Sequence, residues 1–161
     1  MNLHIITTGG TIDKIYFDAK SDYQVGEPVI GELLDTMGVS FPYTVESALR
    51  KDSLDLNDDD RAHIRRLVEA CSEPRVLITH GTDGMVATGQ ALTGLRGKTI
   101  VLTGALQPAA FKSSDAIFNI GCAIGALQAA DAGVYIAMNG RLFGIDNVRK
   151  NLDANRFETL S

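Results

Sequence analysis

Four short apolar runs, rich in β-branched residues, recur along the chain and predict β-strands. They span residues 3–7, 75–79, 99–103 and 134–138. None of them alternates between apolar and polar side chains, which is typical of strands that are covered on both faces. The pattern therefore predicts a sheet inside the protein, with other elements packed on each side of it.

Helical patterns lie between these runs. One helix is predicted to begin at about Asn57, because Asn57 can cap it and the three aspartates that follow place negative charge at its positive end. The others are expected at residues 84–95 and 114–130. This alternation predicts a single α/β domain over residues 1–161. We expect a doubly wound, mainly parallel sheet with helices on both faces, the flavodoxin-like three-layer arrangement.

The helix expected at residues 114–130 carries two surfaces. Its apolar stripe consists of Ile117, Ile120, Ile124 and Leu127. Glycines and alanines form the second surface. One interpretation is a helix buried against the sheet; the alternative is that the extra face packs against a second subunit.

The composition narrows the classes of function. An apolar fraction of 45% and a charged fraction of 22% are those of a folded globular protein. The net charge of −5 provides no basic footprint for nucleic acid. No stretch reaches the roughly 20 apolar residues that span a bilayer, and the N-terminus lacks the pattern of a signal peptide. We therefore expect a cytoplasmic protein with neither a nucleic-acid nor a membrane partner.

Cysteine and histidine are too dispersed to predict a metal centre. Cys71 and Cys122 are far apart and outside any CxxC pattern, so both are expected to be reduced. Three scattered histidines, without paired carboxylates at helical spacing, argue against a metal site. His80 lies in the turn after a predicted strand, but it has no evident nucleophile as a partner.

Glycine follows every predicted strand, and hydroxyl residues accompany it at the first two exits. The exits read TTGGTID at residues 7–13, THGTDG at 79–84, TGA at 103–105 and MNG at 138–140. In an open parallel sheet, ligands bind beyond the carboxyl ends of the strands. If the sheet is parallel, these turns converge on one edge, and that edge is the candidate site.

The two threonine turns indicate acyl-transfer chemistry. Backbone N–H groups around Gly10 and Gly81 can stabilise an oxyanion, and Thr11 or Thr82 can act as a nucleophile or as an orienting group. A single Gly-Thr pair is more often a tight turn, whereas two such turns at strand exits favour a site. Neither turn has the GxxxxGK[ST] or GxGxxG pattern of a phosphate-binding loop.

Two segments resemble the signature motifs of the bacterial-type L-asparaginase family. They are TGGTI at residues 8–12 and ITHGTD at residues 78–83. The likeness continues through SDYQVG at 21–26, LTGALQP at 102–108, the pairs 114–115 and 118–119, and residues 134–150. It covers essentially the whole chain, which is similar to the N-terminal domain of that family.

The resemblance implies a set of catalytic residues. Thr11 would be the nucleophile on a mobile loop, and the neighbouring hydroxyl of Tyr23 would polarise it. Thr82, Asp83 and Lys150 would form a second group of hydroxyl, acid and base. Taken alone, Lys150 reads as a surface lysine. Burial would lower its pKa and let it act as a base, whereas the Asp83 carboxylate would raise that pKa, so both a base and a charged scaffold remain open.

The resemblance also implies how the substrate is held. Asp83 would bind the α-ammonium group of the amino acid, Ser53 its α-carboxylate, and the Ala105 region the amide that is cleaved. The turns at Gly10 and Gly81 would surround the reacting group. The implied reaction is a two-step acyl transfer that releases ammonia from L-asparagine, and weakly from L-glutamine, with neither a metal nor a cofactor. The implied assembly is a homo-oligomer, a dimer or a tetramer.

The chain departs from the family pattern in two places. Family members continue into a smaller C-terminal domain that supplies an acidic residue near the substrate amine, and this chain ends at Ser161. The chain is therefore expected to be a short-form asparaginase or a fragment, and its polar ending favours a natural terminus. Leu54 stands where the family has a polar amide beside Ser53, which predicts a weaker hold on the polar end of the substrate.

Two other functions are compatible with these residues. One is a non-catalytic module that keeps the edge of the sheet and binds an amino acid without cleaving it. The other is the asparaginase-like subunit of a tRNA-linked amidotransferase, which the acidic composition disfavours because it offers no basic surface. The leading hypothesis is an L-asparagine amidohydrolase.

Overall fold

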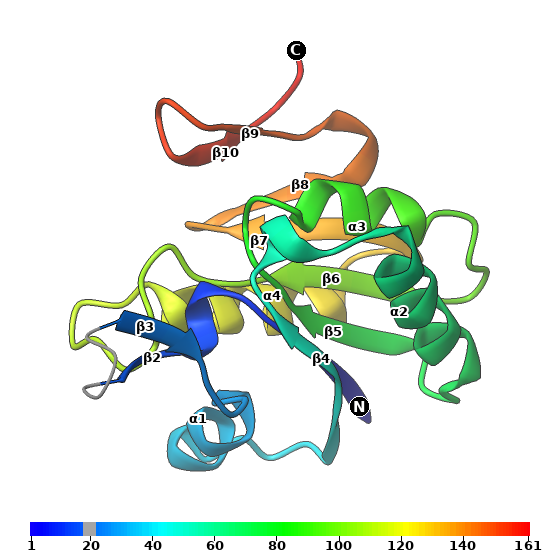
Figure 1. Ribbon diagram of the computed structural model, residues 1–161. Coiled ribbons are helices and arrows are strands. Elements are labelled where there is room, and N and C mark those ends of the chain that lie inside the picture. Colours follow the sequence, from blue (N-terminus) through cyan, green and yellow to red (C-terminus); the bar gives the residue numbers. More distant parts are fainter. Residues whose placement is uncertain (18–21) are drawn as a thin grey trace.

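A mixed six-stranded sheet forms the centre of the computed structural model (Figure 1), which describes residues 1–17 and 22–161. Its strands, in spatial order, are β4 (Tyr43–Lys51), β1 (Leu3–Gly9), β5 (Arg75–Thr79), β6 (Thr99–Thr103), β7 (Gly133–Met138) and β8 (Arg141–Gly144). The first five are parallel to one another, and β8 is antiparallel to β7. The predicted α/β fold with a mainly parallel sheet is confirmed.

The four apolar runs are the four inner strands β1, β5, β6 and β7. Neighbours on the same strand that point to opposite faces, such as Ile5 and Ile6, are both fully buried, so both faces of the sheet are covered. β4 was not predicted because it lies at the edge of the sheet. All of its residues are half-buried or exposed, because it contacts the rest of the sheet on one side only.

Helices cover both faces of the sheet, as predicted. α2 (Asp58–Ala70) and α3 (Met85–Ala91) pack on one face, and α1 (Ile30–Met37) and α4 (Ala116–Ala129) on the other (Figure 1). α2 begins where the sequence predicts it, with Asn57 and Asp60 forming a reciprocal capping box.

Two helices are shorter than predicted. α3 ends at Ala91 rather than near residue 95, because Gly94 takes up a left-handed conformation with a φ of 86°. α4 begins at Ala116 rather than at residue 114, because the side chains of Ser114 and Asp115 bind the backbone of the preceding loop. α4 buries Ile120 and Leu127 against the sheet, whereas Ile117 of the same predicted stripe is 48% exposed, so the first interpretation holds for only part of the stripe. A second-subunit contact remains a prediction.

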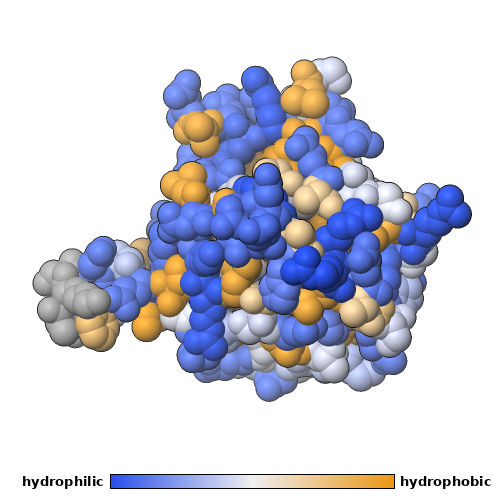
Figure 2. Space-filling view, turned by 45° about the vertical axis from the view of Figure 1, so that its right-hand side comes forward, coloured by the Kyte–Doolittle hydropathy of each residue, from blue (hydrophilic) through white to orange (hydrophobic). Residues whose placement is uncertain are grey.

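Two small hairpins lie outside the central sheet. One pairs β2 (Lys14–Phe17) with β3 (Asp22–Val25), and the other pairs β9 (Arg149–Asn151) with β10 (Arg156–Glu158). The face of the molecule in Figure 2 is mainly hydrophilic, with small hydrophobic groups between the polar ones. None of the helices in residues 1–17 and 22–161 is long and apolar enough to cross a membrane.

The strand order creates a crevice at the carboxyl ends of β1 and β5. From β1 the chain passes to β4 on one side of it, and then crosses back to β5 on the other side. At such a reversal the connections leave in opposite directions, so a gap opens between the two strand exits. The TGGTI and THGTDG turns are these two exits, and the sheet therefore brings them together.

The two turns touch through their backbones. Gly10 has a φ of 86°, and a Cβ atom at this position would lie 2.5 Å from the nitrogen and 2.6 Å from the Cα of Gly81. The amide of Gly10 also donates to the carbonyl of Lys51 at the end of β4, at 3.0 Å. Only glycine combines this conformation with this approach.

Replacing Gly10 by alanine should destabilise the fold by at least about 2 kcal/mol, because the side chain would be strained and would push the two turns apart. Gly125→Ala is the matched control. Gly125 lies inside α4 with nothing within 4 Å of its Cβ position, so alanine there should stabilise the protein by about 0.5–1 kcal/mol. Urea unfolding of both variants measures the difference, and equal effects would contradict the close approach of the turns.

The core should depend strongly on the central strands. Leu102 of β6 is fully buried, so Leu102→Ala should lower the free energy of unfolding by about 2–5 kcal/mol. Leu152, which is 72% exposed, is the control, and Leu152→Ala should change the free energy of unfolding by less than about 0.5 kcal/mol. Chemical denaturation of the two variants tests this difference.

Candidate active site

Lys150 joins Thr82 and Asp83 in one group. Its Nζ donates to the Oγ1 of Thr82 at 2.7 Å and to Oδ1 of Asp83 at 2.5 Å. The lysine side chain is only 9% exposed, so it is not the surface lysine that its position in the sequence alone would suggest. Because the Thr82 oxygen accepts this bond, its own proton is free to be donated elsewhere.

A buried aromatic residue anchors the hairpin that carries Lys150. In this hairpin Phe157 pairs with Lys150 across the two strands, and it is 5% exposed. Its ring packs against that of Phe143 on β8, with 6.5 Å between the centroids. The apolar anchor holds Lys150 beside the exit of β5, although 67 residues separate it from Asp83.

Thr11 begins a short 3-10 turn, Thr11–Asp13, directly beyond Gly10. Thr11 is partly exposed, whereas the next residue, Ile12, is buried in the core and fixes the turn. The carbonyl of Ile12 accepts the amide of Ala109, which ties the turn to the loop after β6 at 3.0 Å. The fold thus places an accessible hydroxyl on a turn held at both ends.

Tyr23 does not reach Thr11 in this arrangement. It lies on β3, is 46% exposed, and packs edge-on against Tyr16 at 5.4 Å and Phe111 at 5.8 Å between ring centroids. No hydrogen bond joins its hydroxyl to Thr11 in the described part of the chain. Ser21, quoted from the same motif, lies outside the described residues.

Ser53 lies behind the second turn. It is 4% exposed, and its Oγ accepts the backbone N–H of Gly84 at 3.0 Å. A Cβ atom on Gly81 would meet the same oxygen at 2.5 Å, so Ser53 is in contact with the turn that carries Thr82. The neighbouring Leu54 is 74% exposed and adds an apolar group to this edge.

A buried amide links the exits of β6 and β7. The Nδ2 of Asn119 donates to the carbonyl of Gly104 at 2.9 Å and to Asp115 at 2.8 Å, while its oxygen accepts the amide of Asn139 at 2.9 Å. Ala105, which follows Gly104, is buried. The sequence signal for this link was a lone asparagine in an apolar helix.

His80 is a structural residue. It is fully buried, and burial lowers its pKa to about 4. Nδ1 lies 2.7 Å from the carbonyl of Gly81, which can only accept, so Nδ1 carries the proton and Nε2 accepts from Thr88 at 2.7 Å. Both ring nitrogens are therefore engaged within the protein, and neither is free for chemistry.

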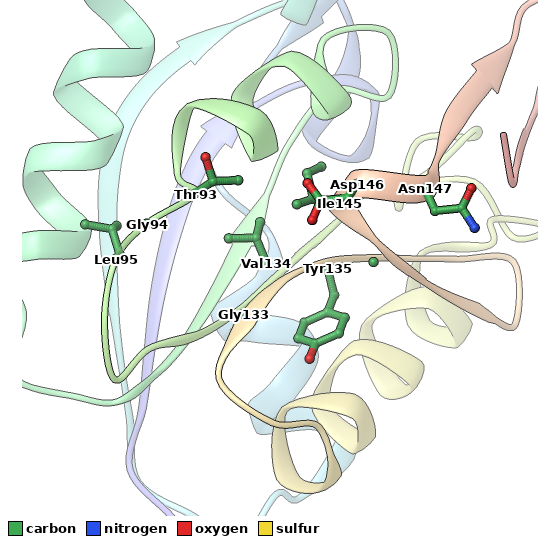
Figure 3. Close-up of a pocket in the computed structure, with 10 residues that line it drawn as sticks. Thr93, Gly94, Leu95, Gly133, Val134, Tyr135, Ile145, Asp146 and Asn147 are labelled. Atoms are coloured by element: carbon green, nitrogen blue, oxygen red, sulfur yellow. The ribbon is translucent and has the colours of Figure 1, made fainter.

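A pocket of about 380 Å³ lies away from this edge (Figure 3). Its lining includes Thr93, Val134, Tyr135 and Ile145. These residues surround the amino-terminal half of β7, whereas the threonine turns lie at carboxyl ends of strands. Within residues 1–17 and 22–161, no three His, Cys, Asp or Glu side chains are grouped so that they could hold a metal ion.

Comparison with known proteins identifies the family. The sequence matches the family model described as "Asparaginase, N-terminal" over residues 2–161. It is 33% identical to the probable periplasmic L-asparaginase of Haemophilus influenzae, with 92% of this chain and 46% of that protein aligned. It is 29% identical to the glutaminase-asparaginase of Acinetobacter glutaminasificans, with 94% of this chain and 50% of that protein aligned.

The fold agrees with solved structures. The thermostable L-asparaginase from Thermococcus kodakarensis superposes with a TM-score of 0.85 at 26% identity, covering 99% of this chain and 51% of that chain. The chain spans about half the length of the relatives it matches. With the family model matched over nearly all of its length, the chain belongs to the asparaginase family, in which it corresponds to the N-terminal domain.

Proposed function

We propose that this chain is the catalytic domain of an L-asparagine amidohydrolase that works through a threonine acyl-enzyme. One observation carries the proposal: the Lys150 ammonium bonds both Thr82 and Asp83 beside the turn of Thr11, where the strand order reverses. A hydroxyl held against a lysine, which is itself paired with a carboxylate, is one arrangement that can activate a hydroxyl and move a proton during attack on an amide. Membership of the asparaginase family supports the same reaction.

The proposed reaction has two steps. The Oγ of Thr11 attacks the side-chain amide carbon, the C–N bond breaks, and ammonia leaves with the proton of the attacking hydroxyl. Water then cleaves the acyl ester, which yields aspartate and restores Thr11. Backbone N–H groups of the turns at Gly10 and Gly81 stabilise the oxyanion in each step. Thr82 orients and relays the proton, and no metal or cofactor takes part.

The polar ends of the substrate meet different residues. Asp83 keeps one carboxylate oxygen beyond its bond with Lys150, and its side chain is 34% exposed, so it can bind the α-ammonium group. Ser53 retains its hydroxyl proton for the α-carboxylate, and Ala105 borders the amide. The Leu54 side chain offers no polar contact, so the affinity for the substrate is low. We also propose weak turnover of the longer L-glutamine.

The proposal also covers the role of Tyr23, the oligomeric state and the location of the protein. Tyr23 polarises Thr11 only after the β2–β3 hairpin turns toward the site, since its ring now packs on Phe111. The active form is a homo-oligomer, a dimer or a tetramer, which light scattering after size exclusion measures. The cytoplasmic location stays a prediction, because the relative from Haemophilus influenzae is named as periplasmic.

Thr11→Ala and Thr82→Ala should each lower the rate of ammonia release from L-asparagine by on the order of 10³-fold, since each removes a hydroxyl of the reacting group. A coupled ammonia assay with L-asparagine and L-glutamine in parallel measures this. Thr36→Ala, on the exposed side of α1, is the matched control and should leave the rate unchanged. Undiminished turnover by Thr11→Ala would overturn the proposal. Calorimetric binding of L-asparagine to the unaltered protein without ammonia release would instead favour a binding module.

Lys150→Met should lower kcat by about 10²–10⁴-fold with a smaller change in KM, because methionine keeps the aliphatic chain but removes the charged donor. Lys112→Met, at an exposed position, is the control. Steady-state kinetics on both variants separates the two constants. A change confined to KM would show that Lys150 only binds substrate.

A further inference from the structure

We propose that Asp13 is a positioning residue that couples the Thr11 turn to the base of the β2–β3 hairpin. The expected effect of Asp13 on kcat rests on the function proposed above. The structural coupling does not, because it concerns hydrogen bonds within the protein. Asp13 is 2% exposed and takes no direct part in the reaction described for Thr11, Thr82 and Lys150.

Asp13 bonds three segments at once. Its N–H donates to the carbonyl of Gly10 at 3.2 Å, which closes the turn that carries Thr11. Its carbonyl accepts the N–H of Gly26 at 2.8 Å, directly after β3. Its carboxylate Oδ1 accepts the N–H of Val29, the residue before α1, at 3.1 Å. One residue therefore joins the nucleophile turn to the chain that returns from the hairpin.

The hairpin depends on such ties because it is small. A two-stranded hairpin alone is marginally stable in water, and here each strand has four residues. It lies at the margin of the molecule, beside the first strand exit (Figure 1). Lys14 bonds Asp52 at 3.1 Å, and Tyr23 packs on Phe111, but neither contact reaches the Thr11 turn itself. Asp13 bonds both the Thr11 turn and the chain that follows β3, in addition to the bond from the Lys14 N–H to the Thr11 carbonyl.

Burial of the Asp13 carboxyl disfavours its charged form. Burial raises its pKa from 3.8 to about 6, and the Val29 N–H and the charge of Arg50 only partly oppose this effect. Oδ2 has no hydrogen-bond partner in the described part of the chain. Two nearby cations pair with other carboxylates. Arg50 on β4 forms a bidentate ion pair with Glu27, and Lys14 on β2 bonds Asp52. A buried, incompletely paired acid beside a reactive turn is typical of functional positions.

The pH dependence of stability follows from this burial. The folded state holds the Asp13 proton more tightly than the unfolded chain, so its stabilising contribution is complete below pH 3.8 and is lost as the pH rises through about 6. His80 acts in the opposite sense. Its folded pKa of about 4 lies below the ordinary histidine value of 6.5, so its contribution is complete above pH 6.5 and is lost as the pH falls toward 4. The two effects oppose each other between about pH 4 and 6.

The test compares Asp13→Ala with Asp13→Asn. Alanine removes the acceptor of the Val29 N–H, so the Val29 amide should exchange with deuterium at least about 10-fold faster, measured residue by residue by NMR. The Gly26 amide keeps its acceptor, the backbone carbonyl of Asp13, so faster exchange there reports loosening of the turn itself. Asparagine keeps an acceptor oxygen and should retain most of the protection. Asp153→Ala, at an exposed position in the β9–β10 turn, is the control and should change neither amide.

Two further readouts separate positioning from mere stability. In an active protein, Asp13→Ala should lower kcat by about 10-fold or more with KM nearly unchanged, and Asp13→Asn should restore most of kcat. Asp13→Asn should also lose more stability than the unaltered protein on acidification from pH 6 to 4, because the opposing gain from Asp13 is absent. This second variant decides the matter if Asp13→Ala does not fold.

The failures of the two proposals differ. Unaltered protein that releases no ammonia would sink the amidohydrolase, while the exchange of Val29 and Gly26 would still decide the structural role of Asp13. Unchanged exchange of both amides in Asp13→Ala would overturn the coupling. Faster exchange with an unchanged kcat would overturn the positioning of Thr11.

Discussion

The backbone contact between Gly10 and Gly81 is the constraint on which the candidate site depends. The sheet order places the exits of β1 and β5 side by side, but only two turns without intervening side chains can approach as closely as these do. That approach holds Thr11 and Thr82, 71 positions apart in the sequence, at one crevice. Ser53 adds a third layer to the same contact, since it packs against Gly81 from behind. A family assignment tells which chemistry to expect there, whereas this contact gives the reason that two hydroxyls lie together.

Around this contact the protein is rigid in some places and loosely tied in others. Hydrogen bonds of the buried Asn119 amide link the carboxyl ends of β6 and β7. Hydrogen bonds at both ring nitrogens fix His80. The β2–β3 hairpin, in contrast, is tied mainly at its base and through exposed aromatic rings. Electrostatic stabilisation needs fixed donors, and substrate entry needs a movable edge. In the proposed reaction the strand exits supply the fixed donors, and the hairpin is the more loosely tied edge.

Sequence patterns predicted the inner strands well and the periphery poorly. β5 and β6 have the predicted bounds because uninterrupted apolar runs between polar flanks leave little ambiguity. β4 was not predicted because charged residues interrupt its apolar positions. α1 was not predicted because a helix of eight residues shows little periodicity. For the site, Thr11 and Thr82 followed from their place after strands. Lys150 followed only from the family resemblance, because a contact across 68 positions leaves no local signal. Asp13 could not be found, because burial of a loop aspartate is decided by the tertiary structure.

The hairpin that carries Lys150 has a consequence for the order in which the protein is made. Ribosomes synthesise chains from the N-terminus, and domains begin to fold as they emerge. The five parallel strands and both threonine turns are encoded before β8, but Lys150 is held by its pairing with Phe157, which emerges later. The threonine pair can therefore form in a nascent chain without the lysine. The contacts of Lys150 with Thr82 and Asp83 therefore form only after the β9–β10 hairpin has left the ribosome and docked.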